Sequence, residues 1–286
     1  MSLRIEDGFR IPALDGFRLA ATWYEPAAGT DKVVLINSAT AVRRRYYDAF
    51  ARFLAGEGFA VLTYDYRGIG DSRPRSLVGF RAWMHQWAED DQEGVLDWIA
   101  RHLHPARLLV VGHSVGGQIV GLADNNSRIS GMLGVAAQNG YWGNWPSPKR
   151  YWLALRWHTV PVVSRIFGYV PGWLGAKEDL PDGVAREWAA WCRRPGFMFQ
   201  GNEERRWGFE SFEKPILAYS FEDDDYAPRR AVESLLETYR NARITHRHIA
   251  PQKLGTRTIG HFGFFRERFK ETLWREAVGW LTEQAA

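Results

Sequence analysis

Residues 108–117 read Leu-Leu-Val-Val-Gly-His-Ser-Val-Gly-Gly, an apolar run that leads into a glycine-rich turn with a serine at its centre. The run is typical of a buried strand, and Gln-Ile-Val-Gly-Leu at 118–122 can continue as a helix. A G-x-S-x-G turn in this context is typical of a nucleophile elbow, where Gly112 and Gly116 avoid collisions between a Cβ and neighbouring backbone. The pattern predicts Ser114 as a nucleophile. The alternative is an ordinary turn in a chain with 28 glycines.

The rest of the chain alternates between apolar runs and helix-length segments. Two short runs around Asp15-Gly16, residues 5–14 and 17–24, predict an antiparallel hairpin. The later runs predict buried strands of a parallel sheet, because helical segments separate them. These strands are expected at 33–36, 60–64, 108–111, 132–136, 216–219 and 244–249, and the helices at 46–56, 88–101, 115–123, 230–239 and 264–284. The sequence therefore predicts an α/β fold with a mostly parallel sheet of about eight strands, flanked by helices.

A long segment, residues 138–213, interrupts this alternation where a crossover between two strands needs far fewer residues. It contains eight of the 14 tryptophans, namely Trp142, Trp145, Trp152, Trp157, Trp173, Trp188, Trp191 and Trp207. We therefore expect a core made of residues 1–137 and 214–286, and a Trp-rich cap made of residues 138–213.

Four segments together carry a resemblance to a known family. They are Asp-Tyr-Arg-Gly-Ile-Gly-Asp-Ser at 65–72, the serine turn at 112–116, Phe-Glu-Asp-Asp-Asp-Tyr-Ala-Pro at 221–228 and Gly-His-Phe-Gly at 260–263. With them the chain resembles the α/β-hydrolase superfamily over nearly its whole length, most closely its monoacylglycerol-lipase, lysophospholipase and serine-aminopeptidase-like members. The resemblance implies a catalytic triad in the order nucleophile, acid, histidine, and an insertion that forms a helical lid over the active site.

The resemblance also indicates the acid and the base. The acidic segment is similar to the family's G-x-x-D-x-x-x-P, with Phe221 in the glycine position, and this register selects Asp224 over Asp223 and Asp225. An acidic surface turn at a strand end is the alternative. His261 lies in a glycine-flanked loop where the family places the base that takes the serine proton. We expect the other histidines to be structural or solvated.

The oxyanion hole is expected to use two backbone N–H groups. One belongs to Val115 at the start of the helix after the serine, and the other to Ala39, with Thr40 as the alternative. Relatives commonly have His-Gly where this chain has Asn37-Ser38, so the shape of this loop is the main departure from the family pattern. Asn37 is a candidate to replace the hydrogen bond of the missing histidine.

Three consecutive arginines, Arg43, Arg44 and Arg45, lie before the predicted helix at 46–56, at the end where cations are disfavoured by about 0.3–1 kcal/mol each. Two explanations stay open. The side chains are solvated or form salt bridges to the insertion, or they attract a carboxylate or phosphate of the substrate. The candidate substrate-binding residues are Asn37, Thr40, Arg43, His113, Trp142 and Trp145, although His113 is equally expected to be scaffold.

The aromatic insertion has two open explanations as well. Its rings could bind an apolar substrate and exclude water, or pack the small core of the cap itself. Residues 152–174 are apolar but interrupted by charged residues and prolines, so weak contact with a lipid interface is a further hypothesis.

Composition limits the other functions. With 45% hydrophobic and 24% charged residues the whole chain should fold. The net charge of +4 comes from scattered cations, so nucleic acid is not an expected partner. A single cysteine, Cys192, and no Cys/His cluster argue against a disulfide and a metal, and no cofactor is expected. The acidic start and the absence of a long apolar run lead us to expect a cytoplasmic protein without a membrane span.

The sequence therefore predicts a serine hydrolase that cleaves a small-molecule carboxylic ester, with an apolar acyl or alcohol group, through an acyl-serine intermediate. The same triad could transfer the acyl group to another alcohol, or cleave an amide or peptide. A different class is a non-catalytic, ligand-binding member of the fold. Chemistries that use an aspartate nucleophile are disfavoured because the elbow carries Ser114.

Overall fold

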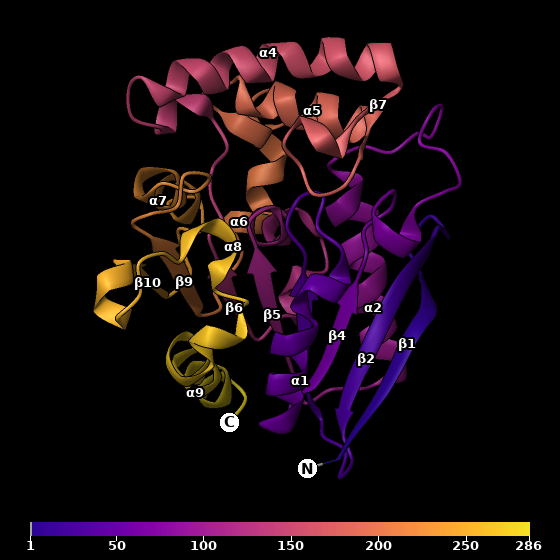
Figure 1. Cartoon of the computed structure of the whole chain (residues 1–286). Coiled ribbons are helices and arrows are strands. Elements are labelled where there is room, and N and C mark those ends of the chain that lie inside the picture. Colours follow the sequence, from indigo (N-terminus) through magenta and orange to yellow (C-terminus); the bar gives the residue numbers. More distant parts are fainter. Residues whose placement is uncertain (1) are drawn as a thin grey trace.

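The computed structural model describes residues 2–286, which form one eight-stranded sheet with helices on both faces (Figure 1). The strand order is β1-β2-β4-β3-β5-β6-β9-β10. The β1–β2 and β2–β4 pairs are antiparallel, and all later pairs are parallel. The bounds are β1 Leu3–Pro12, β2 Arg18–Pro26, β3 Lys32–Asn37, β4 Ala60–Tyr64, β5 Arg107–His113, β6 Gly131–Val135, β9 Ile216–Phe221 and β10 Ile244–Ile249. The predicted hairpin and parallel sheet are both confirmed.

Strands β3, β4, β5, β6 and β9 are buried along almost their whole length, as expected for parallel strands covered on both faces. The last strand, β10, differs. It pairs only with β9 and reads Ile-Thr-His-Arg-His-Ile, with mostly exposed or half-buried side chains. The predicted strand at 244–249 exists, but its predicted burial is wrong, because it forms the edge of the sheet and polar side chains suit an edge.

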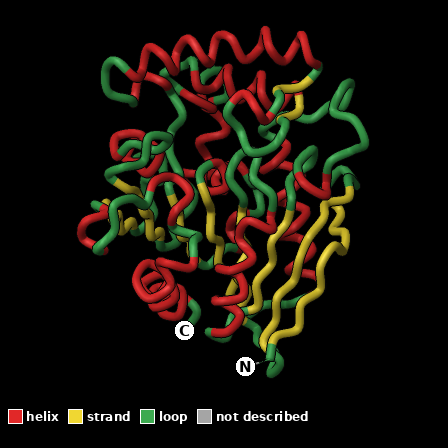
Figure 2. Tube along the Cα trace, viewed as in Figure 1, coloured by secondary structure: helices red, strands yellow, loops and turns green. Residues whose placement is uncertain are grey.

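Helices α1 and α9 cover one face of the sheet and α2 covers the other (Figures 1 and 2). The core helices are α1 Asp48–Gly56, α2 Glu93–His102, α3 Val115–Gln118, α7 Arg229–Leu236, α8 Gly260–Gly263 and α9 Arg275–Gln284. The single helix predicted at 264–284 is wrong. Arg266 has extended backbone angles (φ −89°, ψ 138°) and separates α8 from the 3-10 turn that begins at Glu267. A π-helical turn over Lys270–Trp274 then leads into α9.

The insertion between β6 and β9 contains α4 (Lys149–Phe167), α5 (Asp182–Cys192), α6 (Trp207–Glu210) and the short strands β7 (Tyr169–Val170) and β8 (Leu180–Pro181). Helix α4 packs on α5 and forms the outermost layer (Figure 1). Only Trp157 and Ser164 of α4 are buried, and Trp152 and Ile166 are 71% and 72% exposed. Within residues 2–286, no helix is long and apolar enough to cross a membrane.

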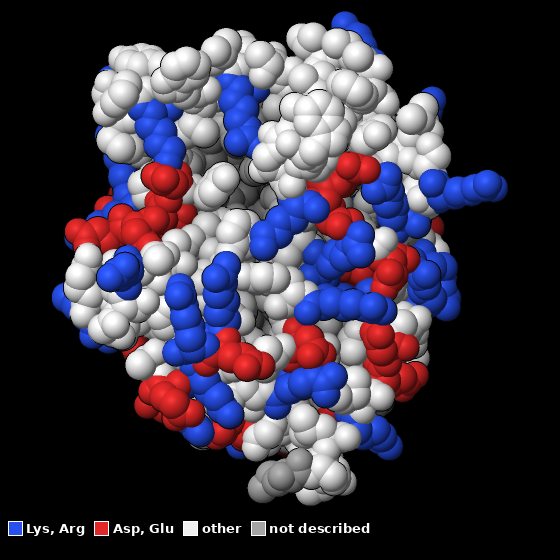
Figure 3. Space-filling view, in the orientation of Figure 1, with Lys and Arg blue, Asp and Glu red and all other residues white. Residues whose placement is uncertain are grey.

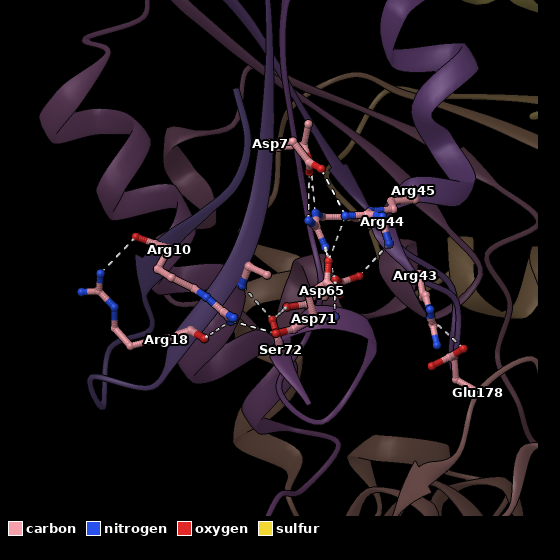
Figure 4. Close-up of polar contacts among 12 residues, drawn as sticks. Asp7, Arg10, Arg18, Arg43, Arg44, Arg45, Asp65, Asp71, Ser72 and Glu178 are labelled. Carbon is pink, nitrogen blue, oxygen red and sulfur yellow. Dashed lines mark hydrogen bonds and ion pairs between the residues drawn. The ribbon is translucent and has the colours of Figure 1, made fainter. Parts of the chain in front are cut away.

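A buried arginine ties the first strands to the turn before α1 (Figure 4). The guanidinium of Arg44, only 1% exposed, donates to Asp65 at 2.5 Å, to Asp71 at 2.7 Å and to Asp7 at 3.0 Å. Its Nε also donates to Thr22 Oγ1 at 2.9 Å. Burial raises the pKa of Asp65 above its ordinary value even though Arg44 acts in the opposite direction. The cluster therefore joins β1, β2 and the segment after β4 at the cost of desolvating the ions.

The structure shows the salt bridges that were one of the two explanations for the neighbouring arginines. Arg43 Nε lies 2.8 Å from a carboxylate oxygen of Glu178 in the insertion, and Arg45 lies 3.2 Å from one of Asp7 (Figure 4). The arginines form salt bridges, one of them to the insertion, and Arg44 is too buried to attract a substrate.

Replacing the buried guanidinium should strongly destabilise the fold. Arg44→Met leaves the buried carboxylate of Asp65 without its cation, so we expect the free energy of unfolding to fall by about 3–5 kcal/mol. The measurement is urea unfolding at pH 7. Arg45→Met is the matched control, because Arg45 is 64% exposed and its ion pairs should contribute less than about 1 kcal/mol. Equal losses in the two variants would contradict the role given to Arg44.

Candidate active site

Ser114 lies in the one-residue turn between β5 and α3. Its backbone angles, φ 52° and ψ −117°, are in a region that costs a non-glycine residue about 1–3 kcal/mol. Its N–H donates to the carbonyl of Val135 on the neighbouring strand β6 at 2.9 Å, which holds the strained turn against the sheet. Such strain is typical of functional sites.

The glycines around Ser114 are required by close backbone packing. A Cβ on Gly116 would lie 2.3 Å from the carbonyl oxygen of Asn37, at the end of β3. A Cβ on Gly112 would lie 2.5 Å from the Cα of Gly117. Any larger residue would therefore push α3 away from the sheet and move the serine.

His261, in α8, is joined to one of the three consecutive aspartates. Its Nδ1 lies 2.8 Å from Asp224 Oδ2, and both side chains are almost fully buried. The other oxygen of Asp224 accepts N–H bonds from Tyr226 at 2.7 Å and Ala227 at 3.0 Å, which fix the carboxylate. An ionised carboxylate only accepts, so Nδ1 of His261 carries the proton and Nε2 is left as a proton acceptor.

The neighbouring aspartates have other partners. Asp223 accepts N–H bonds from Ile259 at 2.8 Å and Gly260 at 3.1 Å, so it holds the loop that precedes His261. Asp225 is 85% exposed and forms an ion pair with Lys149. Of the three, Asp224 alone contacts the imidazole among the described residues.

Ser114 and His261 line the same cavity, which has a volume of about 310 Å³. No hydrogen bond joins Ser114 Oγ to the imidazole among the contacts of residues 2–286. In unliganded enzymes such bonds are often long and tighten when substrate binds. Ser114 and His261 therefore line one cavity without a direct hydrogen bond between their side chains.

The structure corrects the expected oxyanion donor in the loop after β3. The N–H of Ala39 donates to the hydroxyl of Tyr47 at 2.8 Å, so this N–H is already occupied. The alternative, Thr40, lines the cavity beside Ser114. On the other side, the N–H of Val115 is the first of α3 and has no acceptor within the helix. Neither the N–H of Val115 nor that of Thr40 has an acceptor among the turn and loop bonds of the described residues, so both stay candidates for the oxyanion hole.

A buried chain of hydrogen bonds connects this loop to the base. The Tyr47 hydroxyl lies 2.8 Å from His113 Nδ1, and His113 Nε2 lies 2.9 Å from the carbonyl oxygen of His261. A carbonyl only accepts, so Nε2 carries the proton and Nδ1 accepts from Tyr47. Burial, and next the charge of His261, lower the pKa of His113 well below its ordinary value. His113 is therefore a neutral scaffold residue and does not line the cavity.

Asn37 is also structural. Its side chain is fully buried, donates to Gln92 at 2.6 Å and to the carbonyl of Gly116 at 3.1 Å, and accepts from the Tyr64 hydroxyl at 3.0 Å. It supports the elbow from below and does not line the cavity. Its amide thus bonds the end of β3 to the turn that carries Ser114.

The insertion forms most of the outer wall of the cavity. Trp145 lines it and donates its indole N–H to the carbonyl of Asp225 at 2.9 Å, whereas Trp142 lies outside. The sequence did not predict several other lining residues. The only signal for them was their position in the aromatic insertion or next to a catalytic candidate. They are Gln138, Gly140, Leu153, Arg156, Trp157, Gly175, Ala176, Lys177, Leu180, Trp188, Cys192, Tyr226 and Phe262. Within residues 2–286, no cluster of three or more His, Cys, Asp or Glu side chains could hold a metal ion.

The neutral state of His113 predicts how stability depends on pH. An unfolded histidine has a pKa near 6.5. Below that pH the unfolded chain therefore binds a proton at this residue, whereas native His113 stays neutral because its pKa is lowered. As the pH is lowered below 6.5, the free energy of unfolding should therefore decrease. This residue contributes up to about 1.4 kcal/mol for each pH unit. We expect His113→Asn to be less stable at pH 7 but to lose less between pH 7 and pH 5, measured by urea unfolding. His158→Asn, on an exposed part of α4, is the control. An unchanged slope in His113→Asn would contradict the neutral assignment.

Known proteins with the same architecture were found by sequence and by structure. A soluble variant of monoglyceride lipase from Saccharomyces cerevisiae, in complex with a substrate analogue, has a TM-score of 0.71 at 14% identity and 98% coverage of both chains. An esterase of Pyrococcus furiosus has a TM-score of 0.66 at 18% identity, covering 99% of this chain and 91% of that one. At these identities the likeness shows the fold.

In sequence, the quorum-quenching protein AidA of Acinetobacter baumannii (strain MDR-ZJ06) is 30% identical over 122 residues, which span 41% of this chain and 39% of the relative. The chain thus matches about two fifths of that protein's length. The model of the alpha/beta hydrolase family matches residues 33–267, from β3 to the turn after α8. Because this match spans most of the sheet and both ends of the insertion, the chain belongs to the alpha/beta hydrolase family, as its motifs predicted.

Proposed function

We propose that the chain hydrolyses carboxylic esters through an acyl-serine intermediate, with Ser114 as nucleophile, His261 as base and Asp224 as the acid of the triad. The observation that carries this proposal is the His261–Asp224 pair, 2.8 Å apart and buried, in one cavity with a serine on a strained turn. The solved esterases and monoglyceride lipase of the same fold support an ester as the substrate.

In the first half of the reaction, His261 Nε2 takes the proton of Ser114 Oγ as the oxygen attacks the ester carbonyl. Asp224 stays ionised and stabilises the imidazolium through the Nδ1–H bond. The imidazolium then gives its proton to the alkoxide as the C–O bond breaks, and the alcohol leaves. In the second half, His261 takes a proton from water, the hydroxide attacks the acyl-serine, and Ser114 recovers its proton as the acid is released.

The negative charge on the carbonyl oxygen needs donors that are in place before the reaction. The N–H groups of Val115 and Thr40 supply them in this proposal, and the N-terminal end of α3 adds its positive dipole. A preorganised donor of this kind typically changes kcat by about 10²–10³-fold. Ala39 instead fixes the loop, because its N–H is bonded to the buried hydroxyl of Tyr47.

Residues 138–213 act as the cap in this proposal. Trp145, Trp157 and Trp188 line the cavity, and their rings favour an apolar acyl or alcohol group and exclude water from the acyl-serine. Two of them also pack against each other, with the Trp157 and Trp188 ring centroids 4.8 Å apart. The rings therefore serve both the cavity and the core of the cap. The exposed apolar side chains of α4 support the further proposal of weak lipid contact.

The aspartate triplet offers a sharp test of the triad. Ser114→Ala should reduce kcat for p-nitrophenyl butyrate by about 10⁶-fold, to a level set by binding and the oxyanion hole. Asp224→Asn should reduce it by about 10⁴-fold, because the imidazole then adopts the wrong tautomer. The matched control is Asp225→Asn, which removes an exposed carboxylate one residue away and should change kcat by less than about threefold.

Circular dichroism and thermal unfolding of each variant show whether the fold is kept. Full activity of a folded Asp224→Asn, or a loss in Asp225→Asn as large as in Asp224→Asn, would contradict the assignment of the acid.

A further inference from the structure

Two cations of the insertion line the active-site cavity without a carboxylate partner. Arg156 belongs to α4, and Lys177 belongs to the loop between β7 and β8. Both are exposed, and neither forms an ion pair within the described part of the chain. On the face in Figure 3, Lys and Arg side chains border the hollow below α4.

The acids that follow Lys177 in the sequence, and the acid that shares its cavity lining, already form ion pairs. Glu178, the next residue, is paired with Arg43 at 2.8 Å, and Asp179 is paired with Arg73 at 2.9 Å. Asp225, the acid of the cavity lining outside the triad, is paired with Lys149 at 2.5 Å. The charge of Lys177 and of Arg156 is therefore not balanced by the protein at this mouth.

Packing holds both cations in place. The ammonium of Lys177 lies 4.4 Å from the ring centre of Tyr46 and 4.2 Å from that of Phe262, which follows the base and lines the cavity. The guanidinium of Arg156 lies against the backbone of Gly175, where even a Cβ would approach it to 3.3 Å, and 6.0 Å from the Trp157 ring. Since Gly175 and Lys177 belong to one short loop, the two cations lie on the same side of the mouth.

The surroundings of Lys177 favour an added negative charge. Partial burial, and next the charge of Arg266, lower the pKa of Lys177 from its ordinary value, so the protonated amine is held at a cost. A carboxylate at the mouth would reduce this cost and accept hydrogen bonds from both cations. The planar guanidinium can bind both carboxylate oxygens at once, whereas the ammonium acts as a point charge.

We propose that the preferred esters carry a carboxylate on the part that projects to the cavity mouth, where Arg156 and Lys177 bind it. The ester chemistry of this inference rests on the proposed function. The apolar wall of Trp145, Trp157 and Trp188 holds the chain between the reacting carbonyl and the carboxylate. The substrate class is thus the half-ester of a dicarboxylic acid, or an ester of similar chemistry, with an apolar spacer.

The kinetic test compares two substrates that differ by one methyl group, the mono-p-nitrophenyl ester of adipic acid and its neutral methyl p-nitrophenyl diester, with the suberic acid pair as a longer series. Wild type should favour the anionic ester by about 10-fold in kcat/KM. The double variant Arg156→Gln/Lys177→Gln should lower this ratio by about 10-fold through KM. Arg165→Gln, a cation of the same helix outside the cavity lining, should leave the ratio unchanged.

A binding test does not depend on turnover. Ser114→Ala is titrated by calorimetry with the mono-p-nitroanilide of adipic acid and with its methyl ester. The acid should bind about 10-fold more tightly, and the difference should vanish when Arg156→Gln and Lys177→Gln are added.

The outcomes separate the two proposals. Equal binding of the two anilides, or a kinetic ratio that the double variant does not change, overturns the carboxylate site. Charge-dependent binding by Ser114→Ala with no release of p-nitrophenolate by wild type overturns the ester hydrolysis and leaves the carboxylate site standing. Hydrolysis of both esters at equal rates overturns the carboxylate site and leaves the ester hydrolysis standing.

Discussion

The close contact between Gly116 and the end of β3 constrains the whole site. The Asn37 carbonyl lies where a side chain of Gly116 would be, so α3 can approach the sheet only because this residue has no Cβ. That approach forces Ser114 into a strained conformation in which its hydroxyl lines the cavity and the first amides of α3 lie beside it. The side-chain amide of Asn37 donates a hydrogen bond to the carbonyl of Gly116 and so stabilises the same contact.

A second constraint joins the loops on the two sides of the serine. The N–H of Ala39 donates to Tyr47, the hydroxyl of Tyr47 donates to His113, and His113 donates to the carbonyl of His261. The loop after β3 and the segment that contains His261 are therefore joined through buried, neutral groups. Because every donor and acceptor in this chain is matched, its members can be buried at little cost. Asp224 then contacts the imidazole from the other side, through Nδ1 of His261.

Local patterns predicted the sheet, the elbow and the candidate Ser114, because strand runs and tight turns are recorded in neighbouring residues. Asp224 and His261 were selected by the resemblance to the family. What they missed depends on residues far apart or on burial. The N–H of Ala39 is taken by the hydroxyl of Tyr47, and no local pattern indicates where that side chain points. Three arginines in a row look alike, yet only Arg44 is buried among carboxylates from other strands. Arg156 and Lys177 could not be predicted as cavity residues, because they come from the insertion and line the cavity only through its packing on the core.

We propose that Ser114 is a nucleophile activated by its surroundings, and covalent labelling of its hydroxyl can test this. The protein is treated with a fluorophosphonate at pH 7, and the adduct is located by mass spectrometry of peptides. We expect a single adduct on Ser114, its loss in Ser114→Ala and its near-complete loss in His261→Ala. An unlabelled wild-type protein that is folded and binds ligand would contradict this assignment and favour a non-catalytic binding protein. Labelling that survives in Ser114→Ala would contradict it as well, because another residue would then be the nucleophile.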